Sequence, residues 1–301
     1  MTQDRPLLGI SLMLGFCILV PFADALAKIM GSRMPVMHIL TIRFAIQAIM
    51  LLPVLMMSDK AQWRAPGVLR LTFLRTLLHI IGVGFMFTAL IYLPLADAVA
   101  IAFVMPFIML ILGKVFLGEY VGKHRLWACL VGFLGTLLVV QPNFVNVGWL
   151  AMLPFGVAVT FAFFMLVTRK IAKQVAPLGL QAVSGLMASA ILIPATLLAP
   201  SFGLNVAIVM PAQADIILLL GMGVLGTVTH LLMTWSLRYA PSATLAPMQY
   251  LEIPAATLVG WLIFADLPNG LAALGICVTV AAGLYVIWRE RRLAHLVEQP
   301  G

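Results

Sequence analysis

The chain has 301 residues, of which 63% are hydrophobic and only 9% are charged, and its 18 lysines and arginines outnumber its 10 acidic residues. A soluble domain is about half apolar and a quarter charged, so this composition excludes one and predicts a polytopic membrane protein. The long, continuously apolar runs favour transmembrane helices over a β-barrel, whose segments of about ten residues alternate in polarity.

Ten apolar stretches follow one another with short connections, each close to the roughly 20 residues that a helix needs to cross a bilayer. The first also resembles a secretory signal peptide. We nevertheless expect it to be a span, because the internal repeat described below uses it as one. The predicted spans are residues 7–30, 35–57, 68–91, 94–117, 125–141, 148–169, 177–199, 213–237, 241–264 and 268–288.

The charged residues predict how the spans are oriented. If the N-terminus is cytoplasmic, the opposite side receives only Lys28 and Arg33. Cytoplasmic loops are rich in lysine and arginine, so we expect both termini in the cytoplasm and a multi-pass protein of the bacterial inner membrane. The net positive charge is then explained by orientation, and we expect no nucleic-acid partner. The cytoplasmic set is Arg5, Lys60, Arg64, Arg70, Lys123, Arg125, Arg169, Lys170, Lys173, Arg238, Arg289, Arg291 and Arg292.

The two halves of the chain resemble each other. We therefore predict a first five-helix repeat over residues 1–142, a second over 147–289 and a cytoplasmic tail over 290–301. Because each repeat has an odd number of spans, the second must be inverted, which suits alternating access around a site near the bilayer midplane. A shift of 147 aligns Tyr92, Pro94, Ala96, Gly113 and Glu119 with Tyr239, Pro241, Ala243, Gly260 and Asp266, and a shift of 142 aligns Lys28, Ile29 and Pro35 with Lys170, Ile171 and Pro177.

Four ionisable residues are predicted at similar depth on four different spans. Glu252 lies about 16 Å inside its span, and His79, His230 and Arg43 lie about 12–14 Å inside theirs, at 1.5 Å per helical residue. Charged groups at this depth are costly and are expected to face the bundle interior or a wet cavity. We predict that all four bind substrate. The alternatives are a structural clamp for the glutamate, packed interior histidines, and an arginine bonded to backbone carbonyls or to the glutamate.

Two neighbours of the glutamate complete the predicted substrate site. Gln249 lies three residues before it, on the same helix face, and Tyr250 joins the site if Pro247 and Pro254 bend the helix. Such a bend would free carbonyls for a substrate ammonium group, although proline is also simply common in membrane helices. Asp24 and Asp97 lie closer to the outer surface and are candidates for gating or proton coupling, with helix capping as the alternative.

Several other patterns predict no chemistry. The segment GMGVLG at 221–226 matches a dinucleotide-binding fingerprint in its letters, but it lies in an apolar span without a preceding strand, so we expect close helix packing instead. Cys17, Cys129 and Cys277 have no spacing that indicates a disulfide framework or a zinc site. No motif of a hydrolase or an ATPase occurs. We expect no catalytic residues, no cofactor, no metal and no obligatory protein partner.

Three segments carry a resemblance to a known family. FTALIYLPLADAVAIAFVMPFIMLILGKVFLGE at 87–119 with LVGFLGTLLVVQP at 130–142, and HLLMTWSLRYAPSATLAPMQYLEIPAATLVGWLIFAD at 230–266, resemble the two repeats of the drug/metabolite transporter superfamily, in its ten-span EamA-type branch. The resemblance covers essentially the whole chain. It implies an all-α fold of ten helices in inverted five-helix halves, with a central cavity and transport without ATP.

The resemblance extends to bacterial exporters of aromatic and neutral amino acids, and this is the function we predict. Glu252 would bind the ammonium group of a zwitterion, and His79 or Arg43 its carboxylate. One alternative is an uptake carrier for a cofactor-like solute such as S-adenosylmethionine or riboflavin. An alternative of another class is a membrane-embedded enzyme, which turnover in detergent would reveal.

Overall fold

The computed structural model describes residues 5–57, 65–93, 95–141, 148–202, 211–265 and 269–298. In these ranges every regular element is a helix, and each of the ten predicted spans holds helix. The long helices are α1 (Pro6–Gly31), α2 (Val36–Met57), α3 (Val68–Tyr92), α6 (Lys123–Val140), α8 (Met152–Ala172, after the 3-10 turn Gly148–Ala151), α9 (Pro177–Leu198, followed by the 3-10 turn Ala199–Phe202), α10 (Gln213–Tyr239) and α13 (Gly270–Glu298).

Seven of the described helices are long and apolar enough to cross a membrane, and the helix Met105–Leu117 is apolar but shorter. The sequence therefore predicted the helical class correctly. One boundary differs, because α13 continues to Glu298 and makes the described part of the predicted tail helical. Lys60, Arg64 and Asp266 lie outside the described residues.

Two of the predicted spans are broken near their middles. The fourth is split into α4 (Leu95–Ala102) and α5 (Met105–Leu117), and the ninth into α11 (Ser242–Leu245), a 3-10 segment η4 (Ala246–Leu251) and α12 (Glu252–Phe264). Each break lies beside a proline, Pro106 near the start of α5 and Pro247 near the start of η4. Proline cannot donate a backbone hydrogen bond and interrupts a regular helix. The bend predicted from Pro247 is therefore present.

The two breaks meet each other in space. The rings of Phe103 and Tyr250 lie 5.5 Å apart, and the Tyr250 hydroxyl donates to the Phe103 carbonyl at 3.2 Å. These two residues are also 147 positions apart, which is the shift that aligns the halves. At η4 the Met248 carbonyl faces the Cys17 thiol of α1, at 3.7 Å.

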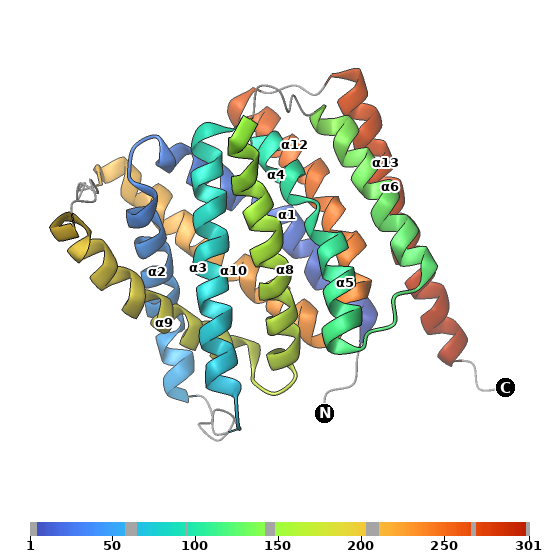
Figure 1. Ribbon diagram of the computed structural model, residues 1–301, viewed down its shortest axis with the longest axis horizontal. Helices are drawn as coiled ribbons and strands as arrows, with labels where there is room; N and C mark the ends of the chain where they lie inside the picture. The colour runs from blue at the N-terminus through green and yellow to red at the C-terminus, as the bar shows by residue number, and fades with distance from the viewer. Residues whose placement is uncertain are drawn as a thin grey trace.

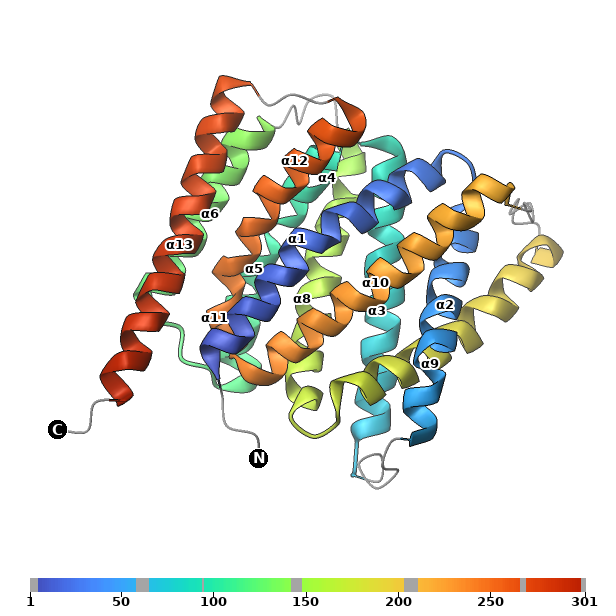
Figure 2. The ribbon, with the colours of Figure 1, turned by 180° about the vertical axis from the view of Figure 1, so that it is seen from behind.

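The helices pair across the two predicted halves. The most extensive contacts join α1 with α10, α3 with α8, α2 with α9, and α6 with α13. Figures 1 and 2 show the pairs α2/α9 and α6/α13 at opposite ends of the molecule, with the other helices between them. A two-fold relation between the halves would produce this pairing, and the exact division of the chain into repeats stays a prediction.

One surface of the bundle collects helix ends that carry positive charge. The start of α1 and the end of α13 lie on the same side (Figures 1 and 2), as do the end of α8, the end of α10 and the start of α3. These helix ends include Arg5, Arg70, Arg169 and Arg238. We call this surface the basic side. The turn between α1 and α2, with Lys28 and Arg33, lies on the opposite side.

Glycines permit the closest helix contacts. A Cβ atom at Gly275 of α13 would lie 2.5 Å from the Gly135 carbonyl of α6, which no real side chain tolerates. Small residues let membrane helices approach until their backbones touch. Within the GMGVLG segment, a Cβ atom at Gly223 would lie 2.6 Å from Ile46 of α2. The prediction that this segment serves helix packing is confirmed.

Candidate functional site

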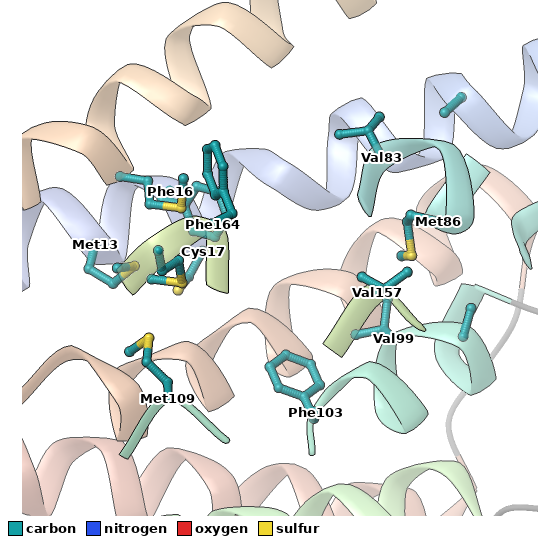
Figure 3. Close-up of a cluster of buried hydrophobic side chains, with 14 of the residues drawn as sticks. Met13, Phe16, Cys17, Val83, Met86, Val99, Phe103, Met109, Val157 and Phe164 are labelled. Atoms are coloured by element: carbon teal, nitrogen blue, oxygen red, sulfur yellow. The ribbon is translucent and has the colours of Figure 1, made fainter. Parts of the chain in front are cut away.

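A cavity of about 90 Å³ lies among α1, α2, α3, α4, α5, α8, α10 and α12, against the two helix breaks. Most of its wall is apolar. Figure 3 shows Met86, Val99 and Val157 gathered at one end of this region and Phe16 at the other, with Phe103 between them. The lining residues are Phe16, Val20, Ala23, Asp24, Arg43, Val83, Met86, Phe87, Val99, Ala102, Phe103, Met105, Val157, Phe161, Met165, Gly226, Thr229, His230, Met233 and Glu252.

Two acidic side chains belong to the cavity wall. Asp24 comes from the second half of α1, and Glu252 is the first residue of α12, directly after the 3-10 break. Among the residues that the structure describes, neither carboxylate has a hydrogen-bond or ion-pair partner. Acidic groups inside a membrane bundle are costly unless they meet a cation or water. The pair is therefore suited to a cationic group in the cavity.

One cation faces the same cavity. Arg43 of α2 is only 3% exposed, and its guanidinium lies 4.8 Å from the centre of the Phe44 ring. Its Nη2 atom donates to Nδ1 of His230 at 3.1 Å, whereas Nη1 has no hydrogen-bond partner in the described part of the chain. The glycine at 226 makes room for it, because a Cβ atom there would lie 2.7 Å from Arg43 Nε. Arg43 thus keeps a free donor for an anionic group.

His230 has two incompatible uses for one ring nitrogen. Its Nδ1 lies 3.1 Å from the Arg43 donor and 2.9 Å from the Gly226 carbonyl. A neutral imidazole nitrogen either accepts or donates, so Nδ1 can serve only one of these neighbours at a time. Withdrawal of Arg43 toward a bound anion would let Nδ1 carry its proton and donate to Gly226. The histidine can therefore respond to occupancy of the arginine.

His79 lies behind His230 rather than in the cavity wall. The two rings are 4.2 Å apart, and Phe164 and Phe44 pack against His79 at 4.7 and 5.0 Å. Neither ring nitrogen of His79 has a hydrogen-bond partner among the described residues. In this conformation it packs against the site from behind and does not contact the cavity.

The other predicted site residues lie elsewhere. Gln249 is fully buried outside the cavity lining, and its amide nitrogen points to the sulfur atoms of Met109 and Met165, each at 3.5 Å. Tyr250 bonds to the backbone at the helix break described above. Asp97 belongs to α4, but its side chain lies outside the described residues. A substrate role for these residues stays a prediction.

Sequence reasoning did not single out Arg75, which the structure buries completely. It lies one helical turn before His79 on α3 and donates only to uncharged groups of α8, α9 and α10. Counting from Arg70 puts Arg75 only about 7.5 Å inside its span, which is shallower than the four residues that depth selected. It was overlooked because it was not separated from the basic residues at the start of the helix.

A second overlooked group closes the bundle at the basic side. The Glu119 carboxylate, at the end of α5, accepts hydrogen bonds from the Ser242 amide at 3.1 Å, its hydroxyl at 2.5 Å and the Ala243 amide at 2.9 Å. Arg169 lies 3.5 Å from the same carboxylate and donates to the Leu237 carbonyl at 2.8 Å. Glu119 was noted only as part of the internal repeat. This latch joins α5, α8, α10 and α11.

The comparisons with known proteins agree on one class. The family described as the EamA-like transporter family matches residues 7–141 and again residues 148–289. The chain is 25% identical to a riboflavin transporter of Vibrio cholerae, over 97% of this chain and 99% of the relative. It is 28% identical to a riboflavin transporter of Rhizobium johnstonii over 72% and 70% of the two chains, and 23% identical to an S-adenosylmethionine uptake transporter of Rickettsia bellii over 89% of both.

A solved crystal structure has the same fold. It superposes with a TM-score of 0.71 and covers 93% of this chain and 97% of its own, at 19% sequence identity. Identity this low supports the fold alone. The relatives are named transporters, and the two substrates in the names quoted above are those of the cofactor alternative rather than amino acids.

Proposed function

This chain belongs to the EamA-like transporter family, and on that premise we propose that it is a secondary transporter of zwitterionic metabolites with an apolar or aromatic body. Aromatic and neutral amino acids are the simplest solutes of this kind, and their export from a bacterial cell across the inner membrane is the function that we favour.

One observation carries the proposal. A largely apolar cavity holds Arg43, whose Nη1 has no hydrogen-bond partner in the described part of the chain, together with two acids, Asp24 and Glu252, that form no hydrogen bond or ion pair there. A zwitterion supplies a partner for each sign of charge, and its side chain replaces water along the aromatic wall formed by residues such as Phe87 and Phe161. Ligand sites typically combine an apolar wall with a few converging polar groups in this way.

A second candidate is uptake of a cofactor-like solute. S-adenosylmethionine has the same amino-acid head on a larger body, so the charged side chains of the cavity could bind it in the same way. Riboflavin has no such head and would depend on the aromatic wall alone. The names of the relatives favour S-adenosylmethionine and riboflavin, whereas the charges of the cavity favour S-adenosylmethionine of the two.

Contacts on both sides of the cavity suit alternating access. On the basic side, the Glu119 latch joins the halves. On the opposite side, Lys28 donates to the Leu93 carbonyl at 2.9 Å, and Arg33 pairs with Asp215 at 2.5 Å. A carrier must open one set of contacts while the other stays closed, and inverted halves provide similar parts on both sides.

The test is counterflow in proteoliposomes that contain the purified protein, with labelled phenylalanine inside and a competitor outside. The competitors are phenylalanine, leucine, S-adenosylmethionine and riboflavin. We expect competition by solutes with an amino-acid head. Competition by riboflavin alone would retain the transporter and refute the zwitterion, and turnover of a substrate in detergent would indicate an enzyme instead.

Variants test the cavity directly. Glu252→Gln and Asp24→Asn each remove one negative charge from the wall, and we expect phenylalanine flux to fall at least tenfold in one or both. Glu290→Gln is the matched control, because this acid pairs with Arg125 and does not line the cavity. Unchanged flux of zwitterions in both cavity variants would refute the proposed role of the acids.

A further inference from the structure

Arg75 is a buried cation whose bonds all go to neutral groups. Its Nε donates to Thr168 at 2.9 Å, Nη1 to Ser184 at 2.8 Å, and Nη2 to Gln181 at 2.9 Å and to Thr234 at 3.1 Å. The four partners come from α8, α9 and α10. The guanidinium also lies 4.6 Å from the centre of the Phe164 ring.

Arg75 has no acidic partner among the residues that the structure describes. In the described ranges, the ion pairs are Arg33–Asp215, Arg125–Glu290 and Arg169–Glu119, and none includes Arg75. A charge taken out of water is costly, and neutral hydrogen bonds offset only part of that cost. A buried arginine of this kind is therefore prepared for an anion.

Two polar atoms of the glutamines near Arg75 have no hydrogen-bond partner among the described residues. Gln47 donates to the Gln181 carbonyl at 2.8 Å, but its own Oε1 has no partner among the described residues, and neither has Nε2 of Gln181. Both residues are fully buried. An amide nitrogen without a partner is a second donor that an anion could use next to the guanidinium.

The position of Arg75 ties its exposure to the opening of the bundle. It belongs to the predicted first half of the chain, and its four hydrogen-bond partners belong to the predicted second half. Thr168 lies four residues before the end of α8 and Thr234 five residues before the end of α10, so this layer lies just inside the basic side. A movement that separated the halves there would break all four bonds and leave the guanidinium free.

A continuous column of planar groups connects Arg75 with the cavity. Phe164 lies between Arg75 and His79 at 4.6 and 4.7 Å, the His79 ring lies 4.2 Å from His230, and His230 accepts from Arg43 at 3.1 Å. At each end of the column lies an arginine that forms no ion pair with the described residues. Of this column only Arg43 and His230 line the cavity, and the Glu119 latch joins the helices at the basic side in this conformation.

We propose that Arg75 is a second anion site, which binds the carboxylate of the transported solute when the protein opens toward the basic side. Arg43 holds that carboxylate when the opposite side is open, and the aromatic column between the two arginines separates the two positions. This inference rests on the proposed transport function, and it adds a site that acts in only one of the two states.

The test measures inhibition from each side of the membrane separately. Proteoliposomes of uniform, verified orientation contain the wild-type protein, Arg75→Gln or Arg75→Lys. Labelled phenylalanine is the substrate, and unlabelled phenylalanine or phenethylamine, which lacks the carboxylate, is the competitor on one side at a time. A competitor on one side binds the state that is open there, so its inhibition constant reports on that state.

For Arg75→Gln we expect phenylalanine to inhibit at least tenfold more weakly from the basic side and within about threefold of wild type from the opposite side. Arg75→Lys keeps the charge and should restore part of the basic-side inhibition. Arg43→Gln should show the reverse sidedness. Equal changes on both sides, or none, for Arg75→Gln would overturn the inference, because a merely structural arginine would act without regard to side.

Further arms keep the inference testable if Arg75→Gln does not fold. In the wild-type protein, phenylalanine must inhibit more strongly than phenethylamine from the basic side, and equal inhibition overturns the inference. Replacing chloride with gluconate must leave that preference unchanged, and its loss would assign the site to an inorganic anion instead. Absence of any phenylalanine flux in wild type would refute the proposed function itself, which is a separate result.

Discussion

The Glu119 latch offers the sharpest test of what holds the basic side closed. The perturbation is Glu119→Ala. The carboxylate is only about 10% exposed and accepts three hydrogen bonds from the first residues of α11, in addition to facing Arg169. Truncation leaves two backbone amides and a guanidinium without this partner.

The magnitude follows from these contacts. Hydrogen bonds to a charged group contribute about 1.5–3 kcal/mol each, and they do not add fully when they share one acceptor. Removal of one member of a buried ion pair costs about 3–5 kcal/mol. We therefore expect Glu119→Ala to lower the free energy of unfolding by about 3 kcal/mol, which is roughly 6 °C in Tm at about 2 °C per kcal/mol for a long chain.

The assay is thermal unfolding of the purified protein in detergent. Glu290→Ala is the matched control, because that buried acid has a single side-chain partner, Arg125, at 2.9 Å. Arg125 donates to it at 2.9 and 3.2 Å, and because these two bonds to a charged group share one acceptor, we expect the control to lose about 2 kcal/mol. A Glu119→Ala protein that melts with wild type, or no lower than the control, would refute the reasoning that capping of α11 holds this side together.

Four further variants probe the helix packing, the contact between the two helix breaks and the Arg33–Asp215 pair, each by the same unfolding measurement. Gly275→Val should lower the free energy of unfolding by about 2 kcal/mol or more, because its side chain would enter the α6 backbone. Gly260→Ala is the control and should change little, because nothing lies within 4 Å of its Cβ position. Similar losses in both variants would contradict the packing argument. Tyr250→Phe removes only the hydroxyl bond across the two breaks and should cost about 1 kcal/mol, and a neutral result would mean that this bond holds nothing. Arg33→Ala breaks the pair with Asp215, but the arginine side chain is 48% exposed, so we expect a loss below about 1 kcal/mol, and a larger one would show that the pair acts as a latch.

The amino-acid sequence by itself determined the class of the fold and the places of its helices. Hydropathy is a local property that the thickness of a bilayer converts into span length, so the predicted ranges agree with α1, α2, α3 and α10 to within two residues. Proline chemistry is equally local, and Pro247 marked the break in the ninth span. The depth of Arg43 and Glu252 followed from counting residues along their helices.

Only the tertiary structure decided which of these polar residues share a cavity. Which side chains face the cavity depends on how each helix is rotated and paired. The 3-10 segment η4 also changes the register that a regular helix would have. Glu252 therefore lines the cavity, whereas Gln249, placed by regular helical spacing on the same face, turns toward two methionines. The burial of Arg75 was likewise decided by the tertiary structure, since it arises from side chains of three helices that are distant in the sequence.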